Sequence, residues 1–267
     1  MIILENVSYT YPNGSEAVKE VTLTIDRGEF VGIIGHSGAG KTTLAKLVVG
    51  LLKPTRGRVL VDGLDTRKTP VSILARKIGY VFQNPETMLF SATIREEMSF
   101  ALRNLGIPPD EALQRINNAL ESVNLFKPFD HSPHTLSFGE KRRLAIACVL
   151  AMDTDFVLLD EPTTGLDYYR CVSLFKSLAE LVKKGKTVMV ITHDTDLLAR
   201  FANRVITLEQ GKVIYDGEAR ELLINVEFLR NHGFSPTHLQ ILAAKLKAKS
   251  PTAEDVAEAL ARVLSAK

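Results

Sequence analysis

The chain has no tryptophan, only two cysteines and almost no excess charge. Lysine and arginine number 33 against 31 aspartate and glutamate, so the net charge of +2 gives no overall field to attract nucleic acid or an anionic membrane. Cys148 and Cys171 both lie in segments with helical apolar spacing. We therefore expect two reduced thiols in the core of a cytosolic protein and not a disulfide framework.

Long hydrophobic runs are also missing. The longest uncharged apolar stretch, Leu144 to Met152, is less than half of the ~20 residues that a membrane-spanning helix needs. The first residues lack a basic segment followed by an apolar run, so no secretory signal is expected. We expect a protein that stays inside the cell and does not itself cross a membrane.

The residues that are present have the composition of a soluble globular protein. The 267 residues are 45% hydrophobic and 24% charged, which excludes a disordered chain, a collagen-like fibre and a coiled-coil rod. Runs of β-branched and apolar residues predict strands at 2–8, 21–25, 30–34, 58–62, 78–82, 156–160, 187–192, 204–208 and 213–215. Helical periodicity follows Lys41 and dominates from about Thr93 to Met152. This alternation predicts an α/β fold with a helical insertion and a C-terminal helical extension.

A glycine-rich segment follows the strand predicted at 30–34 and precedes a helix. The pattern G-x-x-x-x-G-K-[ST] is satisfied by Gly35, His36, Ser37, Gly38, Ala39, Gly40, Lys41 and Thr42. Glycines permit a tight loop whose backbone N–H groups point at phosphate oxygens, and the following helix adds its positive end. Lys41 would then reach the β- and γ-phosphates, and the Thr42 hydroxyl would bind Mg²⁺. A chance glycine-rich turn of this pattern arises in about 1% of chains this long, so we expect a phosphate site.

Two adjacent carboxylates, Asp160 and Glu161, end the apolar strand predicted at 156–160. On their own they are consistent with a strand that meets a turn. Beside a phosphate loop, Asp160 is a candidate ligand on the Mg²⁺ side, and Glu161 is a candidate for polarising the attacking water. Burial of both is costly unless a cation neutralises them, and a metal-bound nucleotide supplies that cation.

The pentapeptide Leu-Ser-Phe-Gly-Glu at 136–140 precedes a strongly helical stretch. Ser137 and Glu140 have the spacing of a capping box, which is the simpler interpretation. The order and spacing of five motifs favour a second one. The phosphate loop, Gln83, the pentapeptide, the two carboxylates and His193 together resemble the ATP-binding cassette (ABC) ATPases.

This resemblance covers about residues 1–217. It implies a P-loop NTPase fold of the ABC nucleotide-binding type, with a helical subdomain at about 93–152 and a C-terminal helical extension at 218–267. It also implies that the protein binds ATP and Mg²⁺ and hydrolyses ATP. The capping box and the family motif are compatible, because a capped helix N-terminus already attracts anions.

In that family the pentapeptide is the signature motif, usually Leu-Ser-Gly-Gly-Gln, which contacts the γ-phosphate held by the opposite subunit. The resemblance therefore places Ser137, Phe138, Gly139 and Glu140 at a partner's nucleotide. Phe138 and Glu140 depart from the usual motif. A negative Glu140 would repel a γ-phosphate unless it turns back to cap its own helix at Ser137.

Other family positions carry over one at a time. Gln83 matches the glutamine that senses Mg²⁺ and the γ-phosphate, and the alternative is an ordinary loop glutamine. His193 matches the switch histidine that contacts the γ-phosphate and the water-positioning acid, whereas a lone histidine after a strand is usually structural. Asp167, in Thr-Gly-Leu-Asp at 164–167, falls in the D-loop at the subunit interface.

Tyr11 matches the aromatic residue that stacks on adenine, although Tyr9 lies two residues away and either ring is a candidate structural residue. Thr43 completes the ATP-binding set that the resemblance implies. The implied Mg²⁺ ligands are Thr42, Gln83 and Asp160, and the implied catalytic residues are Glu161, His193 and Gln83.

Within the family, the chain resembles the ATPases of energy-coupling factor (ECF) importers. It has a single cassette without a fused membrane segment, and 83–97 and 228–236 are similar to the ECF Q-loop region and C-terminal extension. Such systems take up vitamins and transition-metal ions through a substrate-binding membrane protein, a transmembrane coupling protein and two cassette subunits. The resemblance implies these partners, no nucleic acid, and a peripheral position on the cytoplasmic face of the cell membrane.

The second cassette subunit is expected to be a non-identical homologue, and a homodimer is the alternative.

Two other functions compete with transport. A cytosolic ABC-type ATPase acting on DNA typically inserts long coiled coils, whereas the roughly fifty residues between Gln83 and Ser137 show no sustained heptads. A small-molecule kinase shares the phosphate loop but does not explain the pentapeptide.

Two apolar stretches carry further expectations. Met88, Leu89 and Phe90 either offer a landing site for a partner helix or fill the core of the subdomain. After Ser250-Pro251, which has the pattern of a helix start, an apolar stripe is formed by Val256, Leu260, Val263 and Leu264. Because so short a helix is marginal alone, we expect this stripe to be buried on its own domain or across a dimer.

Overall fold

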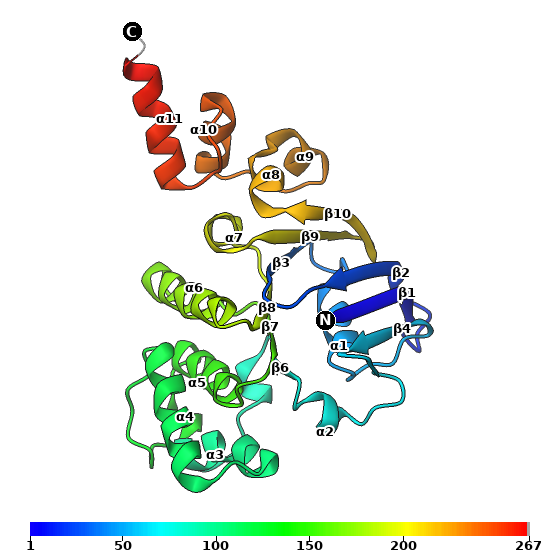
Figure 1. Ribbon diagram of the computed structural model, residues 1–267, viewed down its shortest axis with the longest axis vertical. Coiled ribbons are helices and arrows are strands. Elements are labelled where there is room, and N and C mark those ends of the chain that lie inside the picture. Colours follow the sequence, from blue (N-terminus) through cyan, green and yellow to red (C-terminus); the bar gives the residue numbers. More distant parts are fainter. Residues whose placement is uncertain (266–267) are drawn as a thin grey trace.

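The computed structural model describes residues 1–265 and contains two β-sheets (Figure 1). The first sheet is antiparallel with strand order β2-β1-β4-β5. Its strands are β1 (Ile2–Thr10), β2 (Glu16–Ile25), β4 (Arg56–Val61) and β5 (Leu64–Asp65). Thr10 pairs with Glu16, so the residues between them form the turn that joins β1 to β2.

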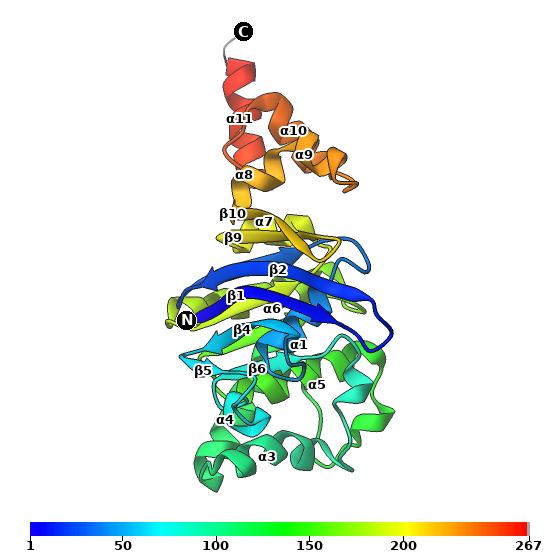
Figure 2. The same cartoon turned by 90° about the vertical axis from the view of Figure 1, so that its right-hand side faces the viewer.

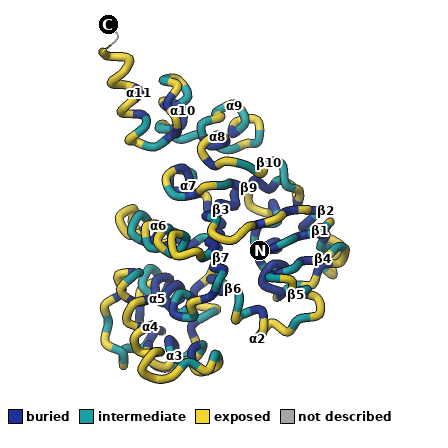
Figure 3. Tube along the Cα trace, viewed as in Figure 1, coloured by how far each residue is buried: buried dark blue, intermediate teal, exposed yellow. Residues whose placement is uncertain are grey.

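The second sheet has the order β10-β9-β3-β8-β7-β6. Its strands are β3 (Phe30–Ile34), β6 (Ile78–Val81), β7 (Phe156–Asp160), β8 (Thr187–Ile191), β9 (Arg204–Glu209) and β10 (Lys212–Glu218). Every residue of β3, β7 and β8 is buried, as expected for parallel strands that are covered on both faces (Figure 3). The strands from β6 to β9 in this order are parallel, so the loops after them meet at one edge of the sheet.

Helices cover the second sheet from both sides. α1 (Lys41–Val48) packs with the first sheet and with one face of β3, β7 and β8. The other face is covered by α5 (Phe138–Ala151), α6 (Tyr168–Lys183) and α7 (Thr195–Phe201). Figure 2 shows β2, β1 and β4 of the first sheet toward the viewer, with β9 and β10 of the second sheet above them and α1 beside β4.

A group of helices lies between β6 and β7 in the chain and forms the green part of Figure 1. α2 (Val71–Leu74) precedes β6, and the group itself consists of η1 (Pro85–Thr87), α3 (Ile94–Leu105), α4 (Pro109–Ser122), η2 (Pro133–Thr135) and α5. Leu89 is buried in the core of this group, whereas Phe90 is 61% exposed. The expectation of a landing site is therefore wrong for Leu89, whose side chain fills the core.

The C-terminal extension forms α8 (Ala219–Ile224), α9 (Val226–Asn231), α10 (His238–Leu246) and α11 (Ala253–Ser265). α11 begins after Thr252, whose Oγ1 accepts a hydrogen bond from the Asp255 N–H, so the start predicted at Ser250-Pro251 is wrong by two residues. In the predicted stripe Val256 is buried, but Leu260, Val263 and Leu264 are exposed. Burial of the stripe on its own domain is thus confirmed for Val256 and wrong for the other three residues, because Ala259 and not Leu260 joins Val256 in the cluster with Ala243 of α10.

Both cysteines are free thiols, with Cys171 buried and Cys148 half-buried. Among residues 1–265, none of the helices combines the length and the apolar character that crossing a bilayer requires.

Candidate active site

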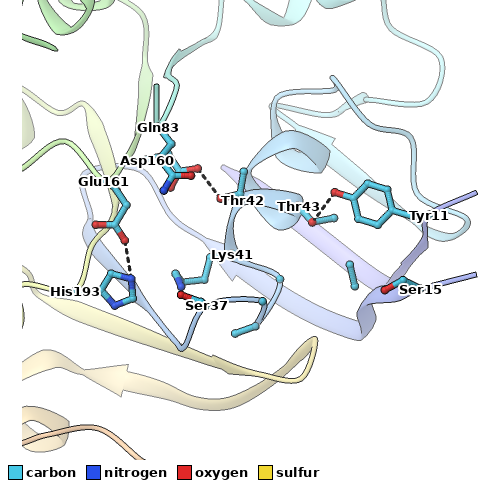
Figure 4. Close-up of a pocket in the computed structure, with 14 residues that line it drawn as sticks. Tyr11, Ser15, Ser37, Lys41, Thr42, Thr43, Gln83, Asp160, Glu161 and His193 are labelled. Carbon is cyan, nitrogen blue, oxygen red and sulfur yellow. Dashed lines mark hydrogen bonds and ion pairs between the residues drawn. The ribbon is translucent and has the colours of Figure 1, made fainter. Parts of the chain in front are cut away.

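A cavity of about 410 Å³ opens where the β1–β2 turn faces the loop after β3 (Figure 4). It is lined by Tyr11, Ser15, Ala17, Ser37, Gly38, Ala39, Gly40, Lys41, Thr42, Thr43, Gln83, Asp160, Glu161 and His193. Residues from six parts of the sequence thus converge at the edge where the parallel strands end. Twelve of the fourteen are residues that the sequence predicted for a nucleotide site, and Ser15 and Ala17 are additions from β2 and the turn before it.

The loop at 35–40 has a backbone that only glycine can adopt at its end. Gly40 has φ +102° and immediately precedes α1, and a Cβ there would lie 2.3 Å from the Ala17 carbonyl oxygen. Gly38 has φ +79°. This conformation, followed by a helix N-terminus, directs backbone N–H groups into the cavity and makes it an anion site.

Lys41 lies at the base of this loop and is buried. Its ammonium donates hydrogen bonds to the carbonyl oxygens of Gly35 at 2.6 Å and His36 at 3.0 Å. Burial lowers the pKa of Lys41, while the charges of Glu161 and Asp160 oppose that shift. This position suits the Lys41 ammonium for binding the oxygens of a phosphate group.

Asp160, at the end of β7, is buried and accepts a hydrogen bond from the Thr42 hydroxyl at 2.7 Å. The Tyr80 hydroxyl, from β6, donates to the same oxygen at 3.3 Å. Burial raises the pKa of Asp160, although both hydrogen bonds favour its ionised form. The oxygens of Asp160, Thr42 and the Gln83 amide are the hard ligands that Mg²⁺ takes beside a nucleotide's phosphates.

Glu161 follows Asp160 and faces His193 across the cavity edge. His193 Nε2 lies 3.1 Å from its Oε1, yet this buried oxygen has no well-directed hydrogen-bond partner among the described residues. Burial raises the pKa of Glu161 to about 6, with a contribution from the Asp160 charge and an opposing one from Lys41. Burial and the positive charge of Lys41 lower the pKa of His193, which is therefore neutral at pH 7. A desolvated carboxylate beside a neutral imidazole can accept a proton from water.

The opposite end of the cavity carries Tyr11, whose hydroxyl lies 3.0 Å from Thr43 Oγ1 (Figure 4). Tyr9 does not line the cavity; its ring packs edge-on against Tyr11, with centroids 4.9 Å apart. Tyr11 therefore remains our candidate for stacking on adenine, and Tyr9 supports it.

Seven predicted residues lie outside the cavity lining. They are Gly35, His36, Ser137, Phe138, Gly139, Glu140 and, in the D-loop, Asp167. The His36 ring stacks on Phe234 of the C-terminal extension. The Asp167 side chain accepts from the Arg170 N–H at 2.9 Å and caps α6.

Glu140 turns back on its own helix. Its Oε2 accepts from the Ser137 N–H at 3.0 Å, Ser137 Oγ accepts from the Glu140 N–H, and Lys127 lies 2.9 Å from the other oxygen. These contacts hold the pKa of Glu140 at about 2. The carboxylate is thus ionised but already paired with Lys127 within this chain, which weakens the expected repulsion of a phosphate. Phe138 is 43% exposed and covers Gly165 of the D-loop.

Sequence analysis missed Arg142, the largest fully buried side chain. Its guanidinium donates to the carbonyl oxygens of Phe82 at 3.0 Å and Gln83 at 2.5 Å, so α5 holds the segment that carries Gln83. The sequence signal for it is the pair Arg142-Arg143, which stands at the start of a stretch that is otherwise apolar and predicted to be a buried helix. Two more residues that the sequence did not single out, Tyr80 and Lys127, act on Asp160 and Glu140.

The family model for ABC transporters matches residues 18–164, more than half of the chain. This chain belongs to the ABC transporter family. It is 42% identical over 232 residues to the ECF transporter ATP-binding protein EcfA of Methanothermobacter thermautotrophicus, and this covers 86% of the chain and 75% of EcfA. The identity to EcfA of Methanosarcina acetivorans is 39%, over 92% of this chain and 90% of that one.

A putative ABC transporter ATP-binding protein of Methanosarcina acetivorans is 39% identical, and the chain spans 40% of its length. Two solved structures are similar to this ABC cassette. One is cbiO1 from Clostridium perfringens, part of the ABC transporter complex cbiONQ, with a TM-score of 0.74 and 37% identity over 86% of this chain and 93% of cbiO1. The other is the dimeric ATP-binding cassette MJ0796 bound to ADP and Pi, with a TM-score of 0.75 and 36% identity over 82% of this chain and 99% of MJ0796.

The chain is therefore an ABC ATPase that binds ATP with Mg²⁺. When bound, Mg²⁺ neutralises the phosphate charge that develops during transfer. Thr42 and Asp160 would hold the metal, Lys41 the phosphates, and Glu161 would take the proton of the attacking water.

Glu161→Gln should lower ATP turnover by about 10²–10⁴, because the amide cannot accept that proton, while ATP binding persists. Turnover of the wild-type chain should rise with pH through about 6, because Glu161 is protonated and inactive below its raised pKa and ionised above it. Steady-state phosphate release measured between pH 5 and 8 tests both statements.

Glu121→Gln, on the surface of α4, is the matched control and should keep the wild-type profile. Turnover of Glu161→Gln within a few-fold of wild type would remove Glu161 from this role. A wild-type profile that is flat across pH 6 would contradict the environment that we assign to it.

Proposed function

We propose that this chain is the ATPase subunit of an ECF-type membrane importer, which couples ATP binding and hydrolysis to uptake of a vitamin or a transition-metal ion. The observation that carries the proposal is an apolar groove of about 250 Å³ beside the Gln83 segment. An exposed apolar hollow on a water-soluble surface is typical of a partner-binding site. The EcfA names of two relatives and the membership of cbiO1 in cbiONQ support the same conclusion.

The exposed apolar side chains of the groove come from four parts of the chain: the loop after α1, α2, the loop after β6, and α3. They are Leu51, Val71, Phe90 and Phe100. Phe90 and Phe100 pack edge-on with centroids 4.9 Å apart. Buried Glu97 fixes the loop, because its Oε2 accepts from the Phe90 and Ser91 N–H groups at 2.8 and 2.7 Å. An apolar helix from a membrane protein fits such a surface.

A path connects this groove to the nucleotide. Gln83 lines the ATP cavity, and the Phe82 N–H points at Met88 Sδ, which lines the groove. Arg142 holds the Phe82 and Gln83 carbonyl groups from α5, the helix that begins with the signature motif. Movement of Gln83 toward bound nucleotide would therefore be felt in the groove and at the signature motif.

We place the chain on the cytoplasmic face of the membrane, bound to a transmembrane coupling protein and, through it, to a substrate-binding membrane protein. The DNA-acting alternative gains no support from the described residues. The longest helix between Gln83 and Ser137 is α4, with 14 residues, which is too short for a coiled-coil arm.

Phe100→Asp should abolish co-purification with the transmembrane coupling protein, because it puts a charge into the apolar groove, while the ATPase activity of the isolated chain stays within about twofold. The measurement is affinity capture from detergent extracts of co-expressing cells, followed by substrate uptake in those cells. Leu113→Asp is the control, since Leu113 is similarly exposed but lies on α4 outside the groove.

Wild-type chain that captures no membrane protein and supports no uptake would contradict the importer assignment. Capture and uptake that survive Phe100→Asp as well as Leu113→Asp would instead leave the assignment intact and place the docking surface elsewhere.

The second cassette is proposed to be a non-identical homologue. The ground for asymmetry is now Phe138 alone, since Glu140 is capped and paired. We expect low ATPase activity of this chain by itself and several-fold more on addition of the partner cassette. Phe138→Gly should raise the activity of the chain alone, whereas Glu140→Gln should not. Full activity alone, without gain from the partner or from Phe138→Gly, would favour the homodimer.

A further inference from the structure

The segment between α9 and α10 reaches back to the phosphate loop. The Phe234 ring stacks on His36 with centroids 4.8 Å apart and an interplanar angle of 20°. His36 Nε2 lies 2.7 Å from the His232 carbonyl oxygen, and a Cβ at Gly233 would be only 3.0 Å from the same nitrogen. The segment thus stacks one ring on His36 and presents a backbone carbonyl oxygen to its Nε2, while His36 remains exposed.

The same segment is anchored to the rigid sheet. His232 Nδ1 lies 2.7 Å from Glu209 Oε2, at the end of β9. The His232 ring also packs against Phe228 of α9, with centroids 4.4 Å apart, and Phe228 packs against Tyr215 of β10. His36 is therefore held against a fixed support and not against a free tail.

This contact leads directly to Lys41. The His36 carbonyl oxygen accepts a hydrogen bond from the Lys41 ammonium at 3.0 Å and another from the Ala39 N–H at 3.1 Å. A change in the position of His36 therefore changes the support of the one buried lysine in the cavity. Neither Phe234 nor His36 lines the cavity, but His36 supports Lys41, which does.

A second contact joins the extension to the other side of the site. Thr237 caps α10 and its hydroxyl donates to Asp196 Oδ1 at 2.9 Å. Asp196 lies in the first turn of α7, whose N-cap Asp194 directly follows His193. The segment 232–237 thus contacts both the phosphate loop and the helix that positions the switch histidine.

We propose that residues 232–237 form a positioning clasp of the ATP site, with Phe234 acting on Lys41 through His36 and Thr237 acting on His193 through α7. Nucleotide binding and docking of the clasp are then linked, and each favours the other by the same factor. The proposal depends on the ATPase activity of the chain and not on its role in transport.

The kinetic test compares single variants of the full chain. Phe234→Ala should raise the KM for ATP between about twofold and tenfold, the range expected for loss of one aromatic pair, with kcat within twofold. Asp196→Ala should lower kcat by a similar factor, with KM within twofold, because it releases α7 without altering the α10 cap.

Two controls match these variants. Leu239→Ala trims an apolar side chain that packs only within the C-terminal extension, and Asp110→Ala removes an acidic first-turn residue of α4. Both should leave KM and kcat within twofold of wild type. If Phe234→Ala does not fold, as judged by thermal unfolding, Phe234→Leu keeps the apolar volume and loses the ring.

Hydrogen exchange provides the reciprocal readout. Mg²⁺ with a non-hydrolysable ATP analogue should slow exchange of the amides at 232–237 in the wild-type chain, and this protection should be lost in Phe234→Ala. Unchanged exchange on nucleotide binding, or KM and kcat in Phe234→Ala equal to those of Leu239→Ala, would overturn the proposal. A fall in kcat and stability without the KM increase would also overturn it, since that is the effect of a merely structural residue.

Discussion

The active site depends on three charged side chains, Asp160, Glu161 and Lys41, that are largely buried at the edge of the sheet where β7 ends. Asp160 and Glu161 follow a strand with no exposed residue, and burial raises the pKa of both carboxyl groups. Lys41 is buried across from them, and burial lowers its pKa. Charged groups that have left water in this way are costly unless each finds a partner. Thr42, Tyr80 and the loop carbonyl groups supply part of that compensation, and Mg²⁺ with nucleotide supplies the rest.

The remaining polar contacts carry this constraint outward. Arg142 is fully buried in α5, and its two terminal nitrogens donate to the Phe82 and Gln83 carbonyl groups, which joins α5 to the segment that carries Gln83. Buried Glu97 accepts hydrogen bonds from the Phe90 and Ser91 N–H groups and so joins the loop that carries Phe90 to α3. Because these buried groups have few alternative partners, we expect the segments to move together and not one at a time. The contacts therefore join the nucleotide site, α5 and the apolar groove.

Much of this arrangement could be predicted from the sequence where local physics decides. The bounds of β3 and β7 were predicted to the residue, because uninterrupted apolar runs flanked by polar residues leave little choice. β2 begins at Glu16 and not at Val21, because an irregularity in the pairing at Glu20, whose φ is +49°, interrupts the alternation of buried and exposed residues that predicts the second half. The phosphate loop and the two carboxylates could be predicted because the order and spacing of these residues in the sequence are what place them around a phosphate.

What escaped prediction depends on tertiary contacts. Nothing local separates Leu89, which fills a core, from Phe90, which faces the groove. Arg142 reads as a surface residue until α5 is seen to be covered on all sides. The His36 ring was expected at the nucleotide, but contacts with residues almost two hundred positions later turn it toward Phe234. Such long-range pairings have no signature in a single sequence.

The most direct test of this account is the thermal unfolding of the chain with ATP, in the presence and absence of Mg²⁺, in a Glu161→Gln background that prevents turnover. We expect Mg²⁺ to add several degrees to the melting temperature beyond ATP with EDTA, because the cation compensates Asp160 in the folded state only. With Asp160→Asn added, the increment from Mg²⁺ should vanish while ATP alone still stabilises. If Mg²⁺ raised the melting temperature of the Asp160→Asn variant by as much as before, this would contradict the claim that the metal compensates the buried Asp160 carboxylate.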